Sequence, residues 1–133
     1  MSMRILLVDD EEELVSTLAE RLTLRGIDAD WAASGEEALA LAAQYKYDVA
    51  VIDLKMPRIS GIDLKKQLAV DHPRLQFIFM SGHGSASTFR SGVDEAGGVD
   101  YFLFKPVDIN QLLSRVKELV ERASGPEWQT TNR

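Results

Sequence analysis

Four short apolar runs set the strongest limit on the fold, because they are apolar at consecutive rather than alternate positions. The runs cover residues 5–8, 49–52, 77–80 and 102–104, and each ends against Asp, Ser or Lys. A strand that is apolar on both sides must be covered on both sides, as in a parallel sheet between two layers of helices. A weaker, more polar run at residues 30–33 carries Trp31 and is interpreted as an edge strand.

Amphipathic helical patterns separate these runs. Gly26 follows the first pattern as a stop signal. Ser34 and Glu37 form a capping box ahead of the second, and Asp108 with Gln111 caps the last. Helices are therefore expected at about residues 14–22, 38–44, 61–69, 87–96 and 109–120.

Five strands that alternate with five helices predict an α/β fold. Right-handed crossovers and two covered faces favour a doubly wound five-stranded parallel sheet with strand order 2-1-3-4-5. The sequence contains no internal repeat and no sign of a second domain. We expect one domain over residues 1–123, followed by a flexible tail or linker start at residues 124–133, where the apolar period is absent.

Composition argues against several classes of function. The net charge of -6 makes direct binding to a nucleic acid backbone unfavourable. Without cysteine the chain has no disulfide or thiolate metal site, which fits a reducing compartment. No apolar run is long enough to span a membrane, and the N-terminal run is too short for a signal peptide. A cytoplasmic domain is expected.

Polar side chains stand at the carboxyl ends of four expected strands. Asp9 and Asp10 follow the first strand, Asp53 the third, Ser81 the fourth and Lys105 the fifth. Parallel sheets bind ligands outside these ends, where the strand order reverses, so the five residues are expected to meet there. Taken singly, each residue also has a structural interpretation as a helix cap, a turn residue or a surface charge.

The chemistry of such a cluster follows from its charges. Three carboxylates in one crevice repel one another unless a cation lies between them, and Mg²⁺ prefers oxygen ligands. An aspartate can act as a nucleophile toward phosphorus, and a lysine can neutralise the transferred group. Asp53 is the best nucleophile candidate, because its strand is central, with acids on one side and Ser81 and Lys105 on the other.

With these residues in place, the sequence resembles the receiver domains of two-component response regulators over about residues 4–122. The matching motifs are ILLVDDEEE, VAVIDLKMPRISG, FIFMSGHG and GGVDYFLFKP. In this order and at these spacings they are specific for the family, although each alone is weak. The matching positions are Asp53, Met56, Pro57 and Gly61 in the second motif, Ser81 in the third, and Lys105 and Pro106 in the fourth.

The resemblance implies a flavodoxin-like fold and a role for each matched residue. Asp53 would be the phosphoacceptor, and Asp10, Asp53 and the backbone carbonyl of Lys55 would bind Mg²⁺ directly, with Asp9 acting through water. Lys105, joined to Pro106 by a cis bond, and Ser81 would contact the phosphoryl group. Phe102 would be the switch aromatic on a face formed by the fourth helix, fifth strand and fifth helix, although it also fits a plain core residue.

This sequence also differs from the receiver family pattern in one interval. The interval from Ser81 to Lys105 is longer than the family pattern, and the extra residues fall within 84–98. The shape of the fourth helix is therefore open. Lys55 and His83 stand where side chains can shape the access of water to the phosphoryl group, although His83 is more simply a solvent-facing loop residue.

The implied partner is a sensor histidine kinase or a phosphotransfer protein, with a phosphorylation-dependent homodimer as a further expectation. Leu14, Val15 and Leu18 on the first helix are candidates for kinase docking, but their spacing fits core residues better. The chain would be a phosphoacceptor switch that assists its own phosphorylation and dephosphorylation, rather than an enzyme.

Three rival interpretations remain. One is a docking or dimerisation module that keeps the receiver fold without being phosphorylated. Another is a haloacid-dehalogenase-type phosphatase, whose Asp-x-Asp motif is absent at Asp53-Leu54-Lys55. The third is a fragment of a longer regulator, for which the segment after residue 123 would begin the linker.

Overall fold

The computed structural model describes residues 3–82 and 101–131. It contains the predicted five-stranded parallel sheet, in the order β2-β1-β3-β4-β5. The weakly predicted strand with Trp31 is indeed at one edge. The strands are β1 (Arg4–Val8), β2 (Asp28–Ala32), β3 (Val49–Asp53), β4 (Gln76–Ser81) and β5 (Tyr101–Phe104).

Four of the five expected helices lie in the described part of the chain. The helix expected near residues 87–96, and His83, lie outside the described residues. Local signals begin or end these helices as predicted: Gly26 has a φ of 81° after α1, and the Ser34 hydroxyl accepts the Glu37 N–H at 3.1 Å. The helices are α1 (Glu12–Leu24), α2 (Gly35–Gln44), α3 (Gly61–Asp71) and α5 (Ile109–Thr131).

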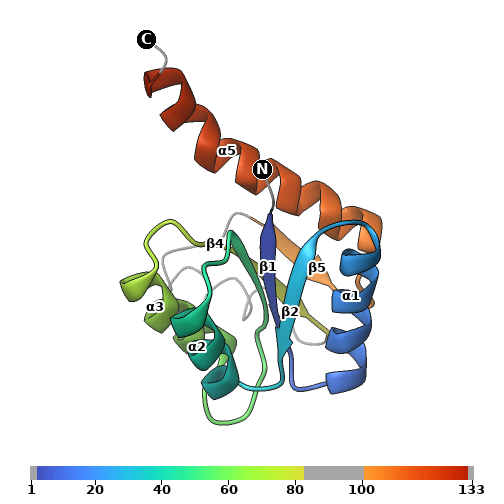
Figure 1. Cartoon of the computed structure of the whole chain (residues 1–133). Coiled ribbons are helices and arrows are strands. Elements are labelled where there is room, and N and C mark those ends of the chain that lie inside the picture. The colour runs from blue at the N-terminus through green and yellow to red at the C-terminus, as the bar shows by residue number, and fades with distance from the viewer. Residues whose placement is uncertain (1–2, 83–100, 132–133) are drawn as a thin grey trace.

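The sheet lies between two layers of helices (Figure 1). Side chains of α1 and α5 pack with one face of the sheet in one apolar cluster, and those of α2 and α3 pack with the other face in a second. Every residue of β3 is buried, as its position in the centre of the sheet requires. Because the two layers of helices bury both faces of the sheet, polar side chains can gather at the carboxyl ends of the strands.

Helix α5 continues beyond the point predicted from the sequence. The expected loose tail at residues 124–133 is wrong for residues 124–131, which are helical. The loss of an apolar period shows that a helix leaves the core, but the backbone hydrogen bonds of a helix already begun can continue without burial. Accordingly, the C-terminal part of α5 extends beyond the sheet (Figure 1). The boundary between domain and linker stays a prediction.

Although α5 is long, it is not apolar enough to cross a membrane, and the same holds for every other helix within residues 3–82 and 101–131.

Candidate functional site

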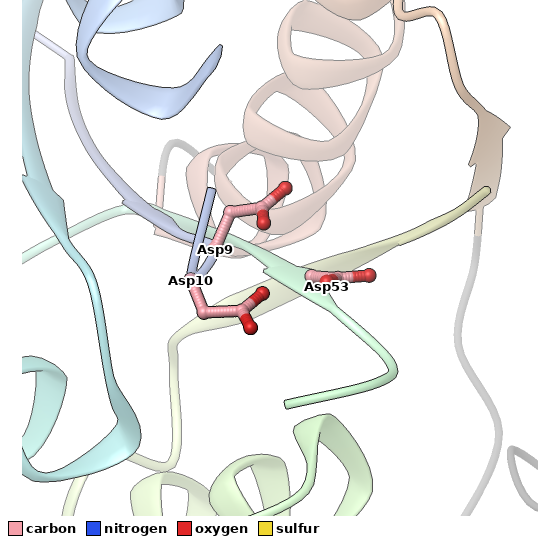
Figure 2. Close-up of side chains that lie close together, drawn as sticks. All are labelled: Asp9, Asp10 and Asp53. Atoms are coloured by element: carbon pink, nitrogen blue, oxygen red, sulfur yellow. The ribbon is translucent and has the colours of Figure 1, made fainter. Parts of the chain in front are cut away.

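Three aspartates converge at the carboxyl ends of two neighbouring strands. Asp9 and Asp10 follow β1, and Asp53 is the last residue of β3, which pairs with β1 in register up to Val8 and Ile52. One carboxylate oxygen from each aspartate lies within 4.8 Å of the other two. Their side chains project into the same space (Figure 2). The predicted convergence of the acids is therefore present.

Lys105 brings a positive charge to this cluster from the end of β5. Its ammonium nitrogen lies 2.8 Å from Asp9 Oδ2, 2.8 Å from Glu11 Oε1 and 3.5 Å from Asp53 Oδ2. The lysine side chain is 14% exposed, and Asp9 is completely buried. The Lys105–Pro106 peptide bond is cis, as expected.

The acids and the lysine border a hollow of about 770 Å³. Ser81, which is buried, and the adjacent Gly82 line it from the end of β4, and Lys55 lines it from the segment after β3. All five residues predicted to meet therefore lie at one end of the sheet. Asp9 is the one of the five that does not line the hollow itself; its side chain is completely buried and contacts the Lys105 ammonium at 2.8 Å.

Burial changes the protonation of Asp53. Removal from water, together with the charge of Asp9, raises the pKa of this carboxyl to about 6, although the ammonium of Lys105 opposes the shift. For Lys105, burial would lower the pKa of the ammonium. The close ion pair with Asp9, the hydrogen bond to Glu11 and the charge of Asp53 outweigh that effect and raise the pKa above its ordinary value.

The raised pKa of Asp53 predicts a pH dependence of the metal-free stability. The folded chain binds the Asp53 proton more tightly than the unfolded chain does, so this group stabilises the fold at low pH. That contribution is lost as the pH rises from about 3.8 to about 6. With a chelator present, the free energy of unfolding of Asp53→Asn should rise relative to that of the parent by about 2–3 kcal/mol across this pH range.

Urea unfolding of the chelated parent and Asp53→Asn at pH 4 and pH 7 measures this gain. A constant difference between the two chains at both pH values would contradict a raised pKa for Asp53.

The acid cluster fits a divalent cation. Asp9 Oδ2 is buried, meets the Lys105 ammonium at 2.8 Å, and has no properly oriented hydrogen-bond donor among the described residues. Asp10 is exposed and turns its carboxylate into the hollow beside Asp53. A hard cation with oxygen ligands would neutralise the repulsion between these carboxylates, which adds to the effect of burial on the pKa of Asp53.

The segment between β3 and α3 is held against its neighbours. Gly61 begins α3 so close to β3 that an added Cβ would lie 2.9 Å from the Cα of Leu54 and closer still to the Asp53 carbonyl oxygen. Arg58 adopts a φ of 67° and pairs with Glu36 on α2 at 2.9 Å. These contacts fix the course of the backbone that carries Lys55 past Asp53.

The structure places the remaining predicted residues as follows. Val15 and Leu18 are buried in the core of the α1 face, so they are not available for docking, whereas Leu14 lines the hollow. Phe102 is partly buried against the core on the α2 side. Met56 packs against that same core and Pro57 is exposed.

Sequence reasoning missed one charged residue of the site. The sequence indicated no role for Glu11 beyond its place in the motif ILLVDDEEE, but its carboxylate contacts the Lys105 ammonium at 2.8 Å. A signal was present, since Glu11 occupies the N-cap position of α1, where Ser, Thr, Asp or Asn is preferred.

Comparison with known proteins gives a consistent picture. The family model described as "Response regulator receiver domain" matches residues 5–117. Response regulator MprA from Mycobacterium sp. (strain KMS) is 34% identical over 127 residues, which are 96% of this chain and 54% of that protein. The chain thus spans about half the length of the curated relatives it matches.

Solved structures agree. The receiver domain of the Francisella response regulator 1452 has a TM-score of 0.79 at 33% identity, over 91% of this chain and 98% of that one. A response regulator from Burkholderia pseudomallei, with a phosphorylated aspartic acid, calcium ion and citrate, has a TM-score of 0.78 at 27% identity, over 95% of this chain and 73% of that one.

Proposed function

The chain belongs to the response regulator receiver family of two-component signalling switches, and we propose that Asp53 is the residue that takes up its phosphoryl group. The observation that supports this assignment best is the setting of Asp53. It ends the central strand β3, is 5% exposed, and faces two acids and Lys105 at 3.5 Å.

The residues present would hold Mg²⁺ through the carboxylates of Asp10 and Asp53 and the backbone carbonyl of Lys55, with Asp9 acting through water. When bound, the ion neutralises negative charge on the carboxylates and on the incoming phosphate. The solved structure of the Burkholderia relative contains a phosphorylated aspartic acid and a calcium ion, and this supports the proposal of an aspartate acceptor and a divalent cation here.

Phosphoryl transfer itself involves few groups. An Asp53 carboxylate oxygen attacks the phosphorus of a phosphohistidine, a P–O bond forms, and the P–N bond breaks with its electron pair left on the histidine nitrogen. Lys105 donates a hydrogen bond to one phosphoryl oxygen and the Ser81 hydroxyl donates to another. The chain acts as acceptor and switch and consumes its donor, so it is not an enzyme in the usual sense.

The switch follows from the added charge. A phosphoryl group adds a charge of about -1.5 to -2 and new acceptor oxygens, which draw Ser81 inward. Phe102, on the strand beside β4 and opposite Phe79, then fills the vacated space. The surface that changes would include β5 and α5, together with the predicted fourth helix outside the described residues.

The partners follow from the same chemistry. A sensor histidine kinase or a phosphotransfer protein in the cytoplasm would supply the phosphoryl group, and the switched face would bind the output partner or a second copy of the chain. Direct nucleic acid binding is not proposed, because the net charge is -6.

The proposal is tested by incubating the chain with acetyl phosphate, with and without Mg²⁺, and measuring its intact mass. A gain of one phosphoryl group that requires Mg²⁺ is the expected result. If the mass does not change under either condition, the chain is instead a docking module that works without phosphorylation.

Magnesium should also stabilise the fold before any phosphoryl transfer. A ligand present at 100 times its dissociation constant raises the free energy of unfolding by about 2.7 kcal/mol, so the melting temperature should rise with Mg²⁺. Asp10→Asn should lose most of this rise, because it removes an exposed ligand without disturbing the core. Asp71→Asn, an exposed acid at the end of α3, is the matched control and should respond as the parent does. An equal rise in both variants would exclude Asp10 as a ligand.

A further inference from the structure

Glu11 belongs to the site cluster but has no part in the proposed metal binding or phosphoryl transfer. Its carboxylate accepts a hydrogen bond from the Lys105 ammonium at 2.8 Å, across 94 residues of sequence. The side chain is 65% exposed, whereas Asp9, the other close partner of Lys105, is completely buried. Glu11 also lines the hollow beside Asp53.

The start of α1 does not require a glutamate at this position. A residue at the N-cap of a helix normally accepts a backbone N–H of the first turn, but the Glu11 side chain makes no such bond. The backbone N–H of Glu11 is instead bonded to Asp9 Oδ1 at 2.9 Å, which fixes its position next to the acid cluster. Glu11 is therefore a residue with low preference for the N-cap position whose side chain contacts Lys105 instead. Residues that go against local preference in this way are expected at functional sites.

The ammonium of Lys105 has three hydrogens to donate. It meets three carboxylates, two at 2.8 Å and Asp53 at 3.5 Å, so the two short contacts keep it away from the carboxylate of the proposed acceptor. A phosphoryl group on Asp53 would require one of these hydrogens. Since Asp9 is buried and Glu11 is exposed, Glu11 is the partner that can leave into water at the lower cost.

We propose that Glu11 is a positioning residue that restrains Lys105 in the unphosphorylated state and releases it when the phosphoryl group arrives. This inference rests on the proposed function of Asp53. The restraint slows phosphoryl uptake, because an ion pair must break before Lys105 can donate to the incoming oxygen. An exposed ion pair of this kind changes an equilibrium by about two- to fivefold.

The test compares Glu11→Gln with Glu12→Gln. Both substitutions remove one exposed acid at the start of α1, but Glu12 is not among the carboxylates that contact Lys105. With Mg²⁺ and acetyl phosphate, Glu11→Gln should take up phosphoryl groups about two to five times faster than Glu12→Gln. In the unphosphorylated chains, the ¹⁵N resonance of the Lys105 ammonium should shift in Glu11→Gln and stay at the parent position in Glu12→Gln.

The outcomes separate the two proposals. If all chains take up phosphoryl groups and Glu11→Gln is no faster than Glu12→Gln, the role of Glu11 is wrong while the proposed function stands. If no chain is phosphorylated, the proposed function fails and the restraint has no purpose. An ammonium resonance that is the same in all three chains would show that the contact does not form in solution.

Discussion

Asp53→Asn is expected to abolish Mg²⁺-dependent phosphoryl uptake, because it removes the carboxylate nucleophile. The amide has nearly the size of the carboxylate, so it leaves Asp9, Asp10 and Lys105 in place, but its oxygen is a far weaker nucleophile. Intact-mass measurement after incubation with Mg²⁺ and acetyl phosphate checks this result, since the parent should gain one phosphoryl group and the variant none.

Unfolding of the variant would not account for such a loss. Asp53→Asn removes a buried carboxylate whose pKa is raised to about 6, so the variant should be at least as stable as the parent at neutral pH. As a control, Asp63→Asn in the first turn of α3 removes a charge elsewhere and should be phosphorylated normally. Equal mass gains in the parent and in Asp53→Asn would displace Asp53 as the acceptor.

Gly61→Ala is expected to lower the free energy of unfolding by about 3 kcal/mol, at the upper end of the usual cost of overpacking. The added Cβ would overlap the carbonyl oxygen of Asp53 and lie 2.9 Å from the Cα of Leu54. Since both are backbone atoms, no rotamer change relieves the overlap, and the chain between β3 and α3 must move. That movement would also break the hydrogen bond from the Gly61 N–H to the Leu54 carbonyl at 3.0 Å.

Urea unfolding of Gly61→Ala beside Gly26→Ala separates crowding from backbone strain. Gly26 has a φ of 81° but no atom within 4 Å of an added Cβ, so its substitution should cost only about 1–2 kcal/mol from the left-handed conformation. Gly61→Ala should also slow phosphoryl uptake, because it displaces the backbone next to Asp53. A Gly61→Ala chain as stable as the Gly26→Ala chain would show that α3 does not approach β3 this closely.

Much of the fold was already predictable from short-range patterns. Consecutive apolar residues at 49–52 identified a strand that must be covered on both faces, and the polar residues that end such runs identified the edge where the site forms. The capping interaction of Ser34 was predicted for the same reason, since it involves residues three apart.

The properties that control the chemistry depend instead on the tertiary structure. The sequence does not show that Asp9 is buried while the adjacent Asp10 is exposed, or that Glu11 meets Lys105. Nor does it show the close approach of Gly61 to Asp53, or the continuation of α5 to Thr131.

The physical reason for this division is the range of the interactions. Periodicity and capping act within a few residues, so the sequence alone determined the five strands, the starts of several helices and the five polar residues at the strand ends. The strand order followed from these elements through the right-handed crossover rule. Burial, charge–charge distance and steric overlap join residues far apart in the chain, and only the packed structure decided their values.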